Sequence, residues 1–387
     1  MDPLVEHQLK FAVVGAGVIG NLHAQTITNL VGAQVAVVVD VAPERARDLA
    51  LRHQARPLAD ISQALSLPEI DAVAICTPSG AHADLVVAAL EAGKHVVVEK
   101  PLDVCLSAAR RVAVAERESG RCVTVISQHR FDPSSRVVRE ALSSGRLGRV
   151  TSGSASIAWW RSQGYYDSAG WRGTWAMDGG GALMNQGIHT IDLLVWFLGR
   201  PVEVFAWTGL LAHERMEVED TAVATVRFAS GALGVIHGTT AAYPGLNARL
   251  QVHGDRGSAV IDDDELTYFH AARESDIGPD LGAGSPGNQA AEVLAPEASQ
   301  ASRAGRRTAG LKPTSHTAQY QDFLSSVASG HPPLVTVAEA TRTLAVVRAI
   351  YESADAGRPV PVDDVDGTGH CGQAGSAVAN ERRLEVQ

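Results

Sequence analysis

The stretch LKFAVVGAGVIG, residues 9–20, decides the fold class because an apolar run leads directly into a G-x-G-x-x-G pattern. Such a run before three spaced glycines predicts a buried strand, a tight turn and the start of a helix. Gly15 would permit the turn, Gly17 would let the backbone approach a pyrophosphate, and Gly20 would let helix and strand pack closely. The alternative is a glycine-rich turn in an α/β domain that binds no nucleotide. The strand–turn–helix context favours the nucleotide site.

The succession of strand and helix continues to about residue 130. Further apolar runs, rich in Val and Ile and without polar alternation, cover residues 33–40, 70–78, 94–101 and 121–127. Continuous apolar strands are typical of a parallel sheet that is covered on both faces. We therefore predict that residues 1–130 form a doubly wound α/β domain with a parallel sheet.

The pattern changes after residue 130. Helical stretches at about 133–144 and 181–198 alternate with apolar segments that short turns separate. These segments predict strands near residues 202–211, 218–228, 232–241, 247–254 and 257–262. Short connections imply antiparallel neighbours, so residues 131–362 are predicted to form an α+β domain with a large open, mostly antiparallel sheet.

Two segments lack the apolar periodicity of packed structure. Residues 271–312 are rich in Ala, Gly, Ser and Pro, and we interpret them as a mobile insert of the second domain. Residues 363–387 are interpreted as a disordered tail.

The composition argues against several classes of protein. The 387 residues carry a formal net charge of −10, which disfavours nucleic acid or an anionic membrane as a partner. No run approaches the roughly 18 apolar residues of a transmembrane helix. The N-terminal MDPLVEHQLKFAVVG lacks the basic and apolar regions of a secretory signal, and the four cysteines lack metal-ligand spacing. We therefore expect a cytoplasmic protein without a metal site.

A dinucleotide at the glycine pattern would meet further residues of the first domain. The phosphates would bind free amides at the helix start, among them those of Val18 and Ile19. Asp40 ends the next strand, where a carboxylate accepts hydrogen bonds from the adenosine ribose and repels a 2′-phosphate. The sequence thus predicts NAD as the cofactor, while Arg45, one turn further on, leaves NADP as the alternative.

Other strand ends supply more candidate cofactor ligands. Thr77 and Pro78 end one apolar run, and Gln128 directly follows another. The carboxyl ends of parallel strands meet at one edge of the sheet, where ligands bind in this architecture. His82 lies in the first turn of the following helix, where it either contacts the cofactor or is an ordinary solvated residue.

The stretch VVVEKPLDV, residues 96–104, places an acid and a base at the end of a buried strand. A lysine enclosed by strand ends, cofactor and a second domain is desolvated, which lowers the pKa of its amine toward that of a general base. Lys100 is therefore predicted to take a hydroxyl proton during hydride removal. Glu99 would point to the opposite face of the strand, toward cofactor ribose or backbone. The alternative is a salt pair of the two residues at the surface.

The stretch GGGALMNQGIHTIDLL, residues 179–194, contains three polar groups in an apolar helical pattern. Asn185, His189 and Asp192 are spaced i, i+4 and i+7, so on an α-helix they share an arc of about 60°. Buried polar groups need partners, which are either one another and the core or a ligand. The triple glycine permits close approach and favours a substrate site, in which Asp192 would orient its neighbours.

The stretch WWRSQGYYDSAGWRGTW, residues 159–175, is dense in aromatic residues and arginine. Such segments bind polyhydroxylated rings or phosphates by stacking and by forked hydrogen bonds. The alternative is an aromatic core beneath a loop. The candidate substrate ligands in this stretch are Arg161, Tyr166, Trp171 and Arg172.

The chain resembles the Gfo/Idh/MocA family of glucose–fructose oxidoreductase, inositol 2-dehydrogenase and their relatives. The motifs GAGVIG, CTPSGAHADL, EKPLD, WRGTW and GGGALMNQGIHTIDLL carry this resemblance. It runs from about residue 10 to 362 and is interrupted only at 271–312. The resemblance implies an N-terminal Rossmann domain and a second domain whose open sheet often forms a homodimer or homotetramer interface.

The same resemblance implies an activity and two catalytic residues. Members oxidise or reduce a secondary hydroxyl or ketone of sugars, sugar derivatives or cyclitols with NAD(H) or NADP(H). Lys100 corresponds to the catalytic lysine and His189 to the active-site histidine. Asn185 stands where many members have aspartate, and an amide carries neither a proton nor a charge. Two alternatives stay open: a glycoside-cleaving enzyme that oxidises its sugar transiently, and a non-catalytic NAD-binding regulator, against which the presence of both Lys100 and His189 argues.

Overall fold

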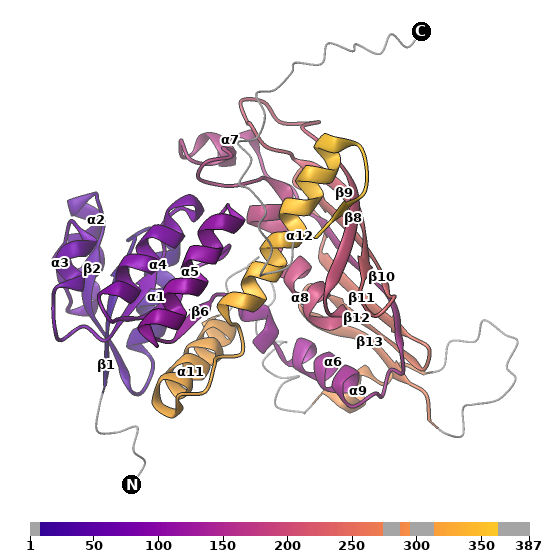
Figure 1. Cartoon of the computed structure of the whole chain (residues 1–387), viewed down its shortest axis with the longest axis horizontal. Helices are drawn as coiled ribbons and strands as arrows, with labels where there is room; N and C mark the ends of the chain where they lie inside the picture. Colours follow the sequence, from indigo (N-terminus) through magenta and orange to yellow (C-terminus); the bar gives the residue numbers. More distant parts are fainter. Residues whose placement is uncertain (1–7, 274–286, 295–312, 363–387) are drawn as a thin grey trace, which may run out of the picture.

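The computed structural model describes residues 8–273, 287–294 and 313–362, and two β-sheets organise them (Figure 1). The first sheet has six parallel strands in the order β3-β2-β1-β4-β5-β6. Its strands are β1 (Leu9–Val14), β2 (Ala33–Val39), β3 (Arg56–Leu58), β4 (Ala72–Ile75), β5 (His95–Val98) and β6 (Val123–Val125). Its helices are α1 (Val18–Thr28), α2 (Pro43–His53), α3 (Ile61–Leu65), α4 (His82–Glu91) and α5 (Leu106–Ser119). The predicted doubly wound domain is confirmed.

The central strand β1 shows why its sequence is continuously apolar. Phe11 and Val13 are buried in one hydrophobic cluster, together with Ile27 of α1. Ala12 and Val14 are buried in a second cluster, which also contains residues of α4 and α5. Alternate side chains of a strand point to opposite faces, so both faces of this sheet are covered. The strand order reverses between β1 and β4, and ligands bind at such a switch point.

The second sheet has eight strands in the order β13-β12-β11-β7-β10-β9-β8-β14. Its strands are β7 (Val150–Ala158), β8 (Pro201–Gly209), β9 (Thr221–Phe228), β10 (Leu233–Thr239), β11 (Ala248–Gly254), β12 (Gly257–Asp262), β13 (Glu265–Ala271) and β14 (Val360–Pro361). Only the pairing of β7 with β10 is parallel among these strands. The open, mostly antiparallel sheet is therefore as predicted, but three of its strands were not expected from the sequence: β7 in its interior, and β13 and β14 at its two edges.

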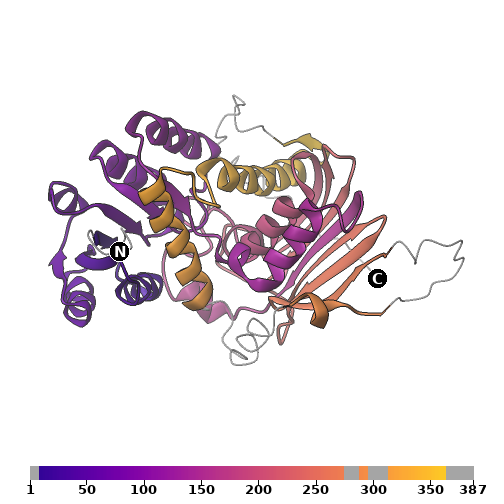
Figure 2. The ribbon, with the colours of Figure 1, turned by 90° about the horizontal axis from the view of Figure 1, so that it is seen from below.

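Helices cover one face of the second sheet. They are α6 (Pro133–Ser143), α8 (Ile188–Leu198) and α12 (Val337–Ala356), and Figure 2 shows them on the side that faces the first domain. Burial along β9 alternates strictly from Ala222 to Phe228, which is typical of a sheet with one packed face. Within the described part of the chain, no helix is both long and apolar enough to cross a membrane.

The predicted helix over residues 181–198 is divided. Its first part, Ala182–Gly187, is a π-helical turn, and the α-helix α8 begins only at Ile188. A Cβ atom on Gly181 would lie 1.9 Å from the backbone oxygen of Glu219, so only glycine fits at this approach. The carboxylate of Glu219 accepts hydrogen bonds from the amides of Gly181 and Leu183, and these bonds hold the π turn in place.

The C-terminal helix α11 (Pro313–Ser329) returns to the first domain. It packs on α1, and the rings of Tyr320 and Phe11 lie 5.9 Å apart. Figure 1 shows α11 beside the first sheet and α12 running up along the second domain. The chain from residue 131 to 362 thus contributes to both halves of the molecule.

The predicted insert 271–312 is only partly described. Residues 287–294 contain the short helix α9 (Ala290–Val293), which packs on β13. The side chain of Gln289 bonds both backbone groups of Ala271, so this part is docked on the sheet. Residues 274–286 and 295–312 of the predicted insert, and the predicted tail 363–387, lie outside the described residues.

Candidate active site

The glycine loop after β1 has the shape that a pyrophosphate needs. A Cβ atom on Gly15 would lie 2.6 Å from the backbone oxygen of Cys76, and one on Gly20 would lie 1.7 Å from that of Gly15. A Cβ on Gly17 would have nothing within 4 Å, so the space above this residue is open. Helix α1 begins there without a side-chain cap, and its first residue, Val18, is 77% exposed. The amides of Val18 and Ile19 are therefore available to a phosphate.

Asp40 and two buried polar groups complete a surface that fits a dinucleotide. The carboxylate of Asp40 accepts hydrogen bonds from the amides of Ala16, at 2.7 Å, and Ala42, at 2.8 Å, and so lies against the glycine loop. The hydroxyl of Thr77 and the side-chain oxygen of Gln128 are buried without a hydrogen-bond partner in the described part of the chain. Buried polar groups are rarely left unpaired in proteins, so these atoms fit contacts to a bound cofactor.

His82 joins the ends of two strands. Its Nδ1 lies 2.7 Å from the backbone oxygen of Pro101, and its Nε2 lies 2.8 Å from that of Thr77. The ring is fully buried, so it positions the loops after β4 and β5, including Thr77 and Pro78, and has no nitrogen left for a cofactor.

Glu99 holds the backbone at the lysine. Its Oε1 lies 2.9 Å from Nε2 of His23, and its Oε2 accepts a hydrogen bond from the Lys100 amide. The other nitrogen of His23 lies 2.7 Å from the hydroxyl of Tyr320. Burial opposes ionisation, but the hydrogen bond and charge of His23 keep the pKa of Glu99 well below its usual value. Of the two expected positions, cofactor ribose or backbone, the carboxylate occupies the one on the backbone.

The amine of Lys100 is held by Asn185, and a carboxylate stands behind that amide. The lysine Nζ donates to the backbone oxygen of Asn185 at 2.8 Å and to its Oδ1 at 3.1 Å. The amide nitrogen of Asn185 donates to Asp178 at 2.6 Å, and the backbone amide of Gly173 donates to the other oxygen of Asp178. Asp178 is not among the predicted site residues, and its only signal in the sequence is its position directly before the triple glycine.

Lys100 and His189 lie together. Both line one small cavity of about 20 Å³ at the end of β5, together with Pro101 and Ile188. Burial lowers the pKa of Lys100; Glu99 and Asp178 oppose this effect. Burial also lowers the pKa of His189 well below its usual value, and His129 and Lys100 add to the shift. The site therefore combines an amine of lowered pKa with a neutral imidazole.

Asp192 shares the wall of this cavity but is occupied by the core. Its carboxylate accepts two hydrogen bonds from the guanidinium of Arg130, both at 2.7 Å. It also bonds the hydroxyls of Ser127 and Thr343. None of these four bonds goes to Asn185 or His189, so they anchor Asp192 in the core and leave it little capacity for a substrate, and its orienting role toward those two residues stays a prediction.

The aromatic stretch places two arginines beside the site. Arg161 donates from Nε and from a terminal nitrogen to Oε1 of Gln186, at 3.1 and 2.8 Å. Gln186 in turn donates to the hydroxyl of Tyr165, which also accepts from Arg172. The Arg172 guanidinium lies over the rings of Tyr165, at 4.2 Å, and Trp171, at 4.6 Å.

The neighbouring Tyr166 lies elsewhere. It is buried, and its hydroxyl bonds the side chain of Thr240 at 2.8 Å. The structure thus brings Tyr165 and Gln186, which sequence analysis did not select, into the cluster with Arg161 and Arg172, while Tyr166 supports the loop from the inside.

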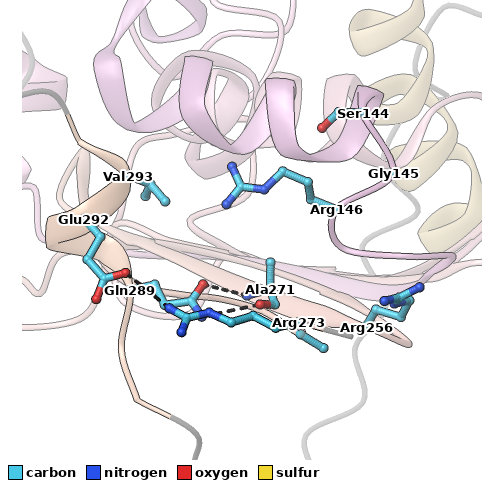
Figure 3. A pocket seen from close by; sticks show the side chains of 10 residues that line it. Ser144, Gly145, Arg146, Arg256, Ala271, Arg273, Gln289, Glu292 and Val293 are labelled. Carbon is cyan, nitrogen blue, oxygen red and sulfur yellow. Dashed lines mark hydrogen bonds and ion pairs between the residues drawn. The ribbon is translucent and has the colours of Figure 1, made fainter. Parts of the chain in front are cut away.

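A larger cavity, of about 380 Å³, lies at the far end of the second sheet. Figure 3 shows it between Arg146 and the β13–α9 region, where Gln289 bonds Ala271 and Glu292 faces Arg273. None of the predicted site residues lines it. The residues predicted to carry the chemistry therefore lie away from it, with Lys100 and His189 at the smaller cavity.

Comparisons with known proteins match both halves of the chain. One family model, described as oxidoreductase family with an NAD-binding Rossmann fold, matches residues 9–127. A second, the GFO/IDH/MocA C-terminal domain, matches residues 135–260.

Individual relatives extend over most of the chain. YrbE of Bacillus subtilis, an uncharacterized oxidoreductase, is 30% identical over 67% of this chain and 75% of its own length. The myo-inositol 2-dehydrogenase of Thermotoga maritima is 27% identical over 93% of this chain and 100% of its own. The WlbA dehydrogenase of Bordetella pertussis, crystallised with NADH and UDP-GlcNAcA, is 30% identical, with a TM-score of 0.80 over 93% of this chain and 99% of its own. With its glycine loop, its lysine and histidine at one cavity and these matches across both sheets, the chain belongs to the GFO/IDH/MocA family of NAD-binding oxidoreductases.

Proposed function

We propose that the chain is an NAD-dependent dehydrogenase that moves hydride between nicotinamide and a secondary hydroxyl or ketone of a sugar or cyclitol. The observation that supports it most is that the Lys100 amine and the His189 ring line one cavity at the carboxyl edge of the first sheet. This edge also carries Thr77 and Gln128, whose buried polar atoms fit a cofactor. The matched relatives named for inositol and crystallised with a sugar nucleotide support the substrate class.

In this mechanism Lys100 is the general base. Bound NAD supplies the hydride acceptor. Burial lowers the pKa of the amine, so Lys100 is a better base at moderate pH than an exposed lysine, and it takes the proton of the reacting hydroxyl as the carbonyl forms. Asn185 orients the amine through its two oxygens. His189, whose pKa burial lowers well below its usual value, holds the same hydroxyl by a hydrogen bond.

We assign Asp178 a positioning role in this step. Its charge raises the pKa of Lys100 and so stabilises the ammonium that forms when the lysine accepts the proton. It acts through the Asn185 amide, which it orients by a 2.6 Å hydrogen bond. The carboxylate that many relatives place at position 185 is thus supplied from seven residues upstream.

The test is Lys100→Ala, assayed by NADH formation on a panel of polyols and sugars. The variant should bind NAD as the wild type does, while turnover falls by about 10² or more. Lys10→Ala, at the opposite end of the first sheet, is the matched control and should retain turnover. Full turnover by Lys100→Ala would contradict the assignment.

The same assay separates the two alternatives. A glycoside-cleaving enzyme would release the aglycone from a sugar glycoside without net NADH. A regulator would bind NAD and turn over no member of the panel. Net NADH formation in proportion to oxidised substrate is the result that we expect.

We further propose a homodimer or homotetramer that uses the open face of the second sheet. On this face Trp207 of β8 is 63% exposed, Leu233 and Val235 of β10 are 59% and 46% exposed, and Val223 of β9 is 42% exposed. A second copy would bury this apolar patch. Trp207→Glu should lower the molar mass measured by light scattering, whereas Leu51→Glu, at an exposed position of α2, should not. An unchanged mass in Trp207→Glu would argue against this interface.

A cytoplasmic location without nucleic-acid or membrane partners completes the proposal. It rests on the acidic balance of charge, −10 for the chain, and on the use of NAD. Cell fractionation with an antibody against the chain would test the location.

A further inference from the structure

The charges around Lys100 are not balanced. The guanidiniums of Arg161 and Arg172 are near enough to lower the pKa of its amine. Their hydrogen-bond acceptors are neutral, the Gln186 amide for Arg161 and the Tyr165 hydroxyl for Arg172. Among the described residues, neither guanidinium lies within ion-pair distance of a carboxylate. Asp178 interacts with Arg172 through its charge, but the hydrogen bonds to its carboxylate come from Asn185 and Gly173.

Two other arginines of this chain show the usual pairing with carboxylates. The buried Arg130 forms ion pairs with Asp192 and Glu339, and the exposed Arg215 forms one with Asp167. Arg172 also has its Nε buried without a hydrogen-bond partner in the described structure. A buried guanidinium donor without an acceptor is costly, so a ligand that supplies an acceptor binds favourably there.

We propose that Arg161 and Arg172 bind an oxyanion carried by the substrate, so that the enzyme acts on an acidic sugar or cyclitol. This inference rests on the proposed function. The planar guanidinium fork matches carboxylate and phosphate equally well, and both are the charge that the site lacks. The stacking of Arg172 on Tyr165 and Trp171 fixes the plane of the fork beside the site.

Matched sugars test this proposal. The probes are D-glucose, D-glucuronate and D-glucose 6-phosphate, and the galactose set of the same three forms. Their affinity for the NAD-loaded enzyme is measured by titration calorimetry, independently of turnover. At least one charged form should bind about 10- to 100-fold more tightly than its neutral partner, the scale of charge-assisted hydrogen bonds. The form that does so, uronate or phosphate, identifies the oxyanion.

Substitutions assign the preference to the arginines. Arg172→Gln and Arg161→Gln should reduce the ratio of charged to neutral affinity several-fold each, and Arg172→Lys should retain part of it because the charge remains without the fork. A substitution that damages the site as a whole weakens binding of the charged and the neutral sugar alike, so it leaves this ratio unchanged. Arg215→Gln, which removes a surface ion pair, should keep the full ratio.

Two outcomes would overturn the inference. One is equal affinity for charged and neutral forms in the wild type across both sets. The other is an undiminished ratio in both glutamine variants. If NADH still forms from neutral polyols in either case, the proposed dehydrogenase function stands and only the acidic substrate is lost.

Discussion

Asp178→Asn isolates the effect of the carboxylate behind the lysine. The substitution removes one negative charge and keeps the shape of the side chain. The hydrogen bonds from Lys100 to Asn185 and from Asn185 to Asp178 measure 3.1 and 2.6 Å. With the width of the amide between them, the ammonium lies within about 8 Å of the carboxylate. At an effective dielectric constant of about 20, this separation corresponds to an interaction of roughly 2 kcal/mol between the ammonium and the carboxylate.

The expected result is a shift of the pH profile. Asp178 raises the pKa of Lys100, so its loss lowers that pKa. The acid limb of kcat/KM for alcohol oxidation should therefore move by about 1 to 2 units toward lower pH. The plateau should fall, because the ammonium is less well stabilised. In the wild type, burial raises the pKa of Asp178 to about 6. Protonation of Asp178 near that pH should therefore make the acid limb steeper. The variant, which has no carboxylate at this position, should lack the steeper part.

The measurement is the initial rate of NADH formation between about pH 5 and 10, a span that brackets these pKa values. Asp167→Asn removes the same charge from the surface helix α7 (Gln163–Asp167) and should leave the profile in place. An unshifted acid limb in Asp178→Asn, with normal NAD affinity, would refute the action of Asp178 on Lys100.

Three further predictions concern the first domain. Gly17→Ala should keep the thermal stability of the protein, because its Cβ has room, but should lose NAD affinity in titrations, because that room is where the pyrophosphate would lie. Gly20→Ala should be less stable, because its Cβ would lie 1.7 Å from the backbone oxygen of Gly15. Asp40→Ser should weaken NAD binding about 10-fold and reduce discrimination against NADP, because ribose acceptors are lost. Glu99→Gln should lower the free energy of unfolding in urea by about 3–5 kcal/mol at pH 7, because it breaks a buried pair with His23. The Glu99 pKa is lowered in the fold, so this difference should shrink below pH 4.5, and because the His23 pKa is raised, it should shrink again at high pH, once His23 loses its proton.

The architecture was predictable because its signals are local. A parallel strand buried on both faces is apolar throughout, as in β1, and one buried on a single face alternates, as in β9. The strand expected over 218–228 is observed at Thr221–Phe228, a difference of a few residues at one end. The helical period also predicted Asn185 and His189 on one face of a single α-helix. In the structure Asn185 lies in the π turn and His189 in α8, which follows it.

What escaped prediction depends on contacts between distant residues. The π turn is held by Glu219, more than thirty residues further along the chain, and no period of the turn itself encodes that carboxylate. Tyr165 and Tyr166 are equivalent in sequence, and the hydroxyl of Thr240 decides which of them is drawn into the core. Asp178 is only seven residues from Asn185, but Gly179 and Gly180 between them have positive φ, so no helical period aligns the two.

The position of the carboxylate leads to a final prediction. One amide away, Asp178 stabilises the ammonium of Lys100 by roughly 2 kcal/mol, whereas a carboxylate in direct contact at about 4 Å would give about 4 kcal/mol. The double variant Asp178→Asn with Asn185→Asp makes that exchange and leaves the net charge unchanged. The pKa of Lys100 should rise, so the acid limb of kcat/KM should move above that of the wild type by about 1 to 2 units. This direction is opposite to that of Asp178→Asn alone. If both variants shift the limb to the same side, the distance between carboxylate and amine does not set the basicity of Lys100.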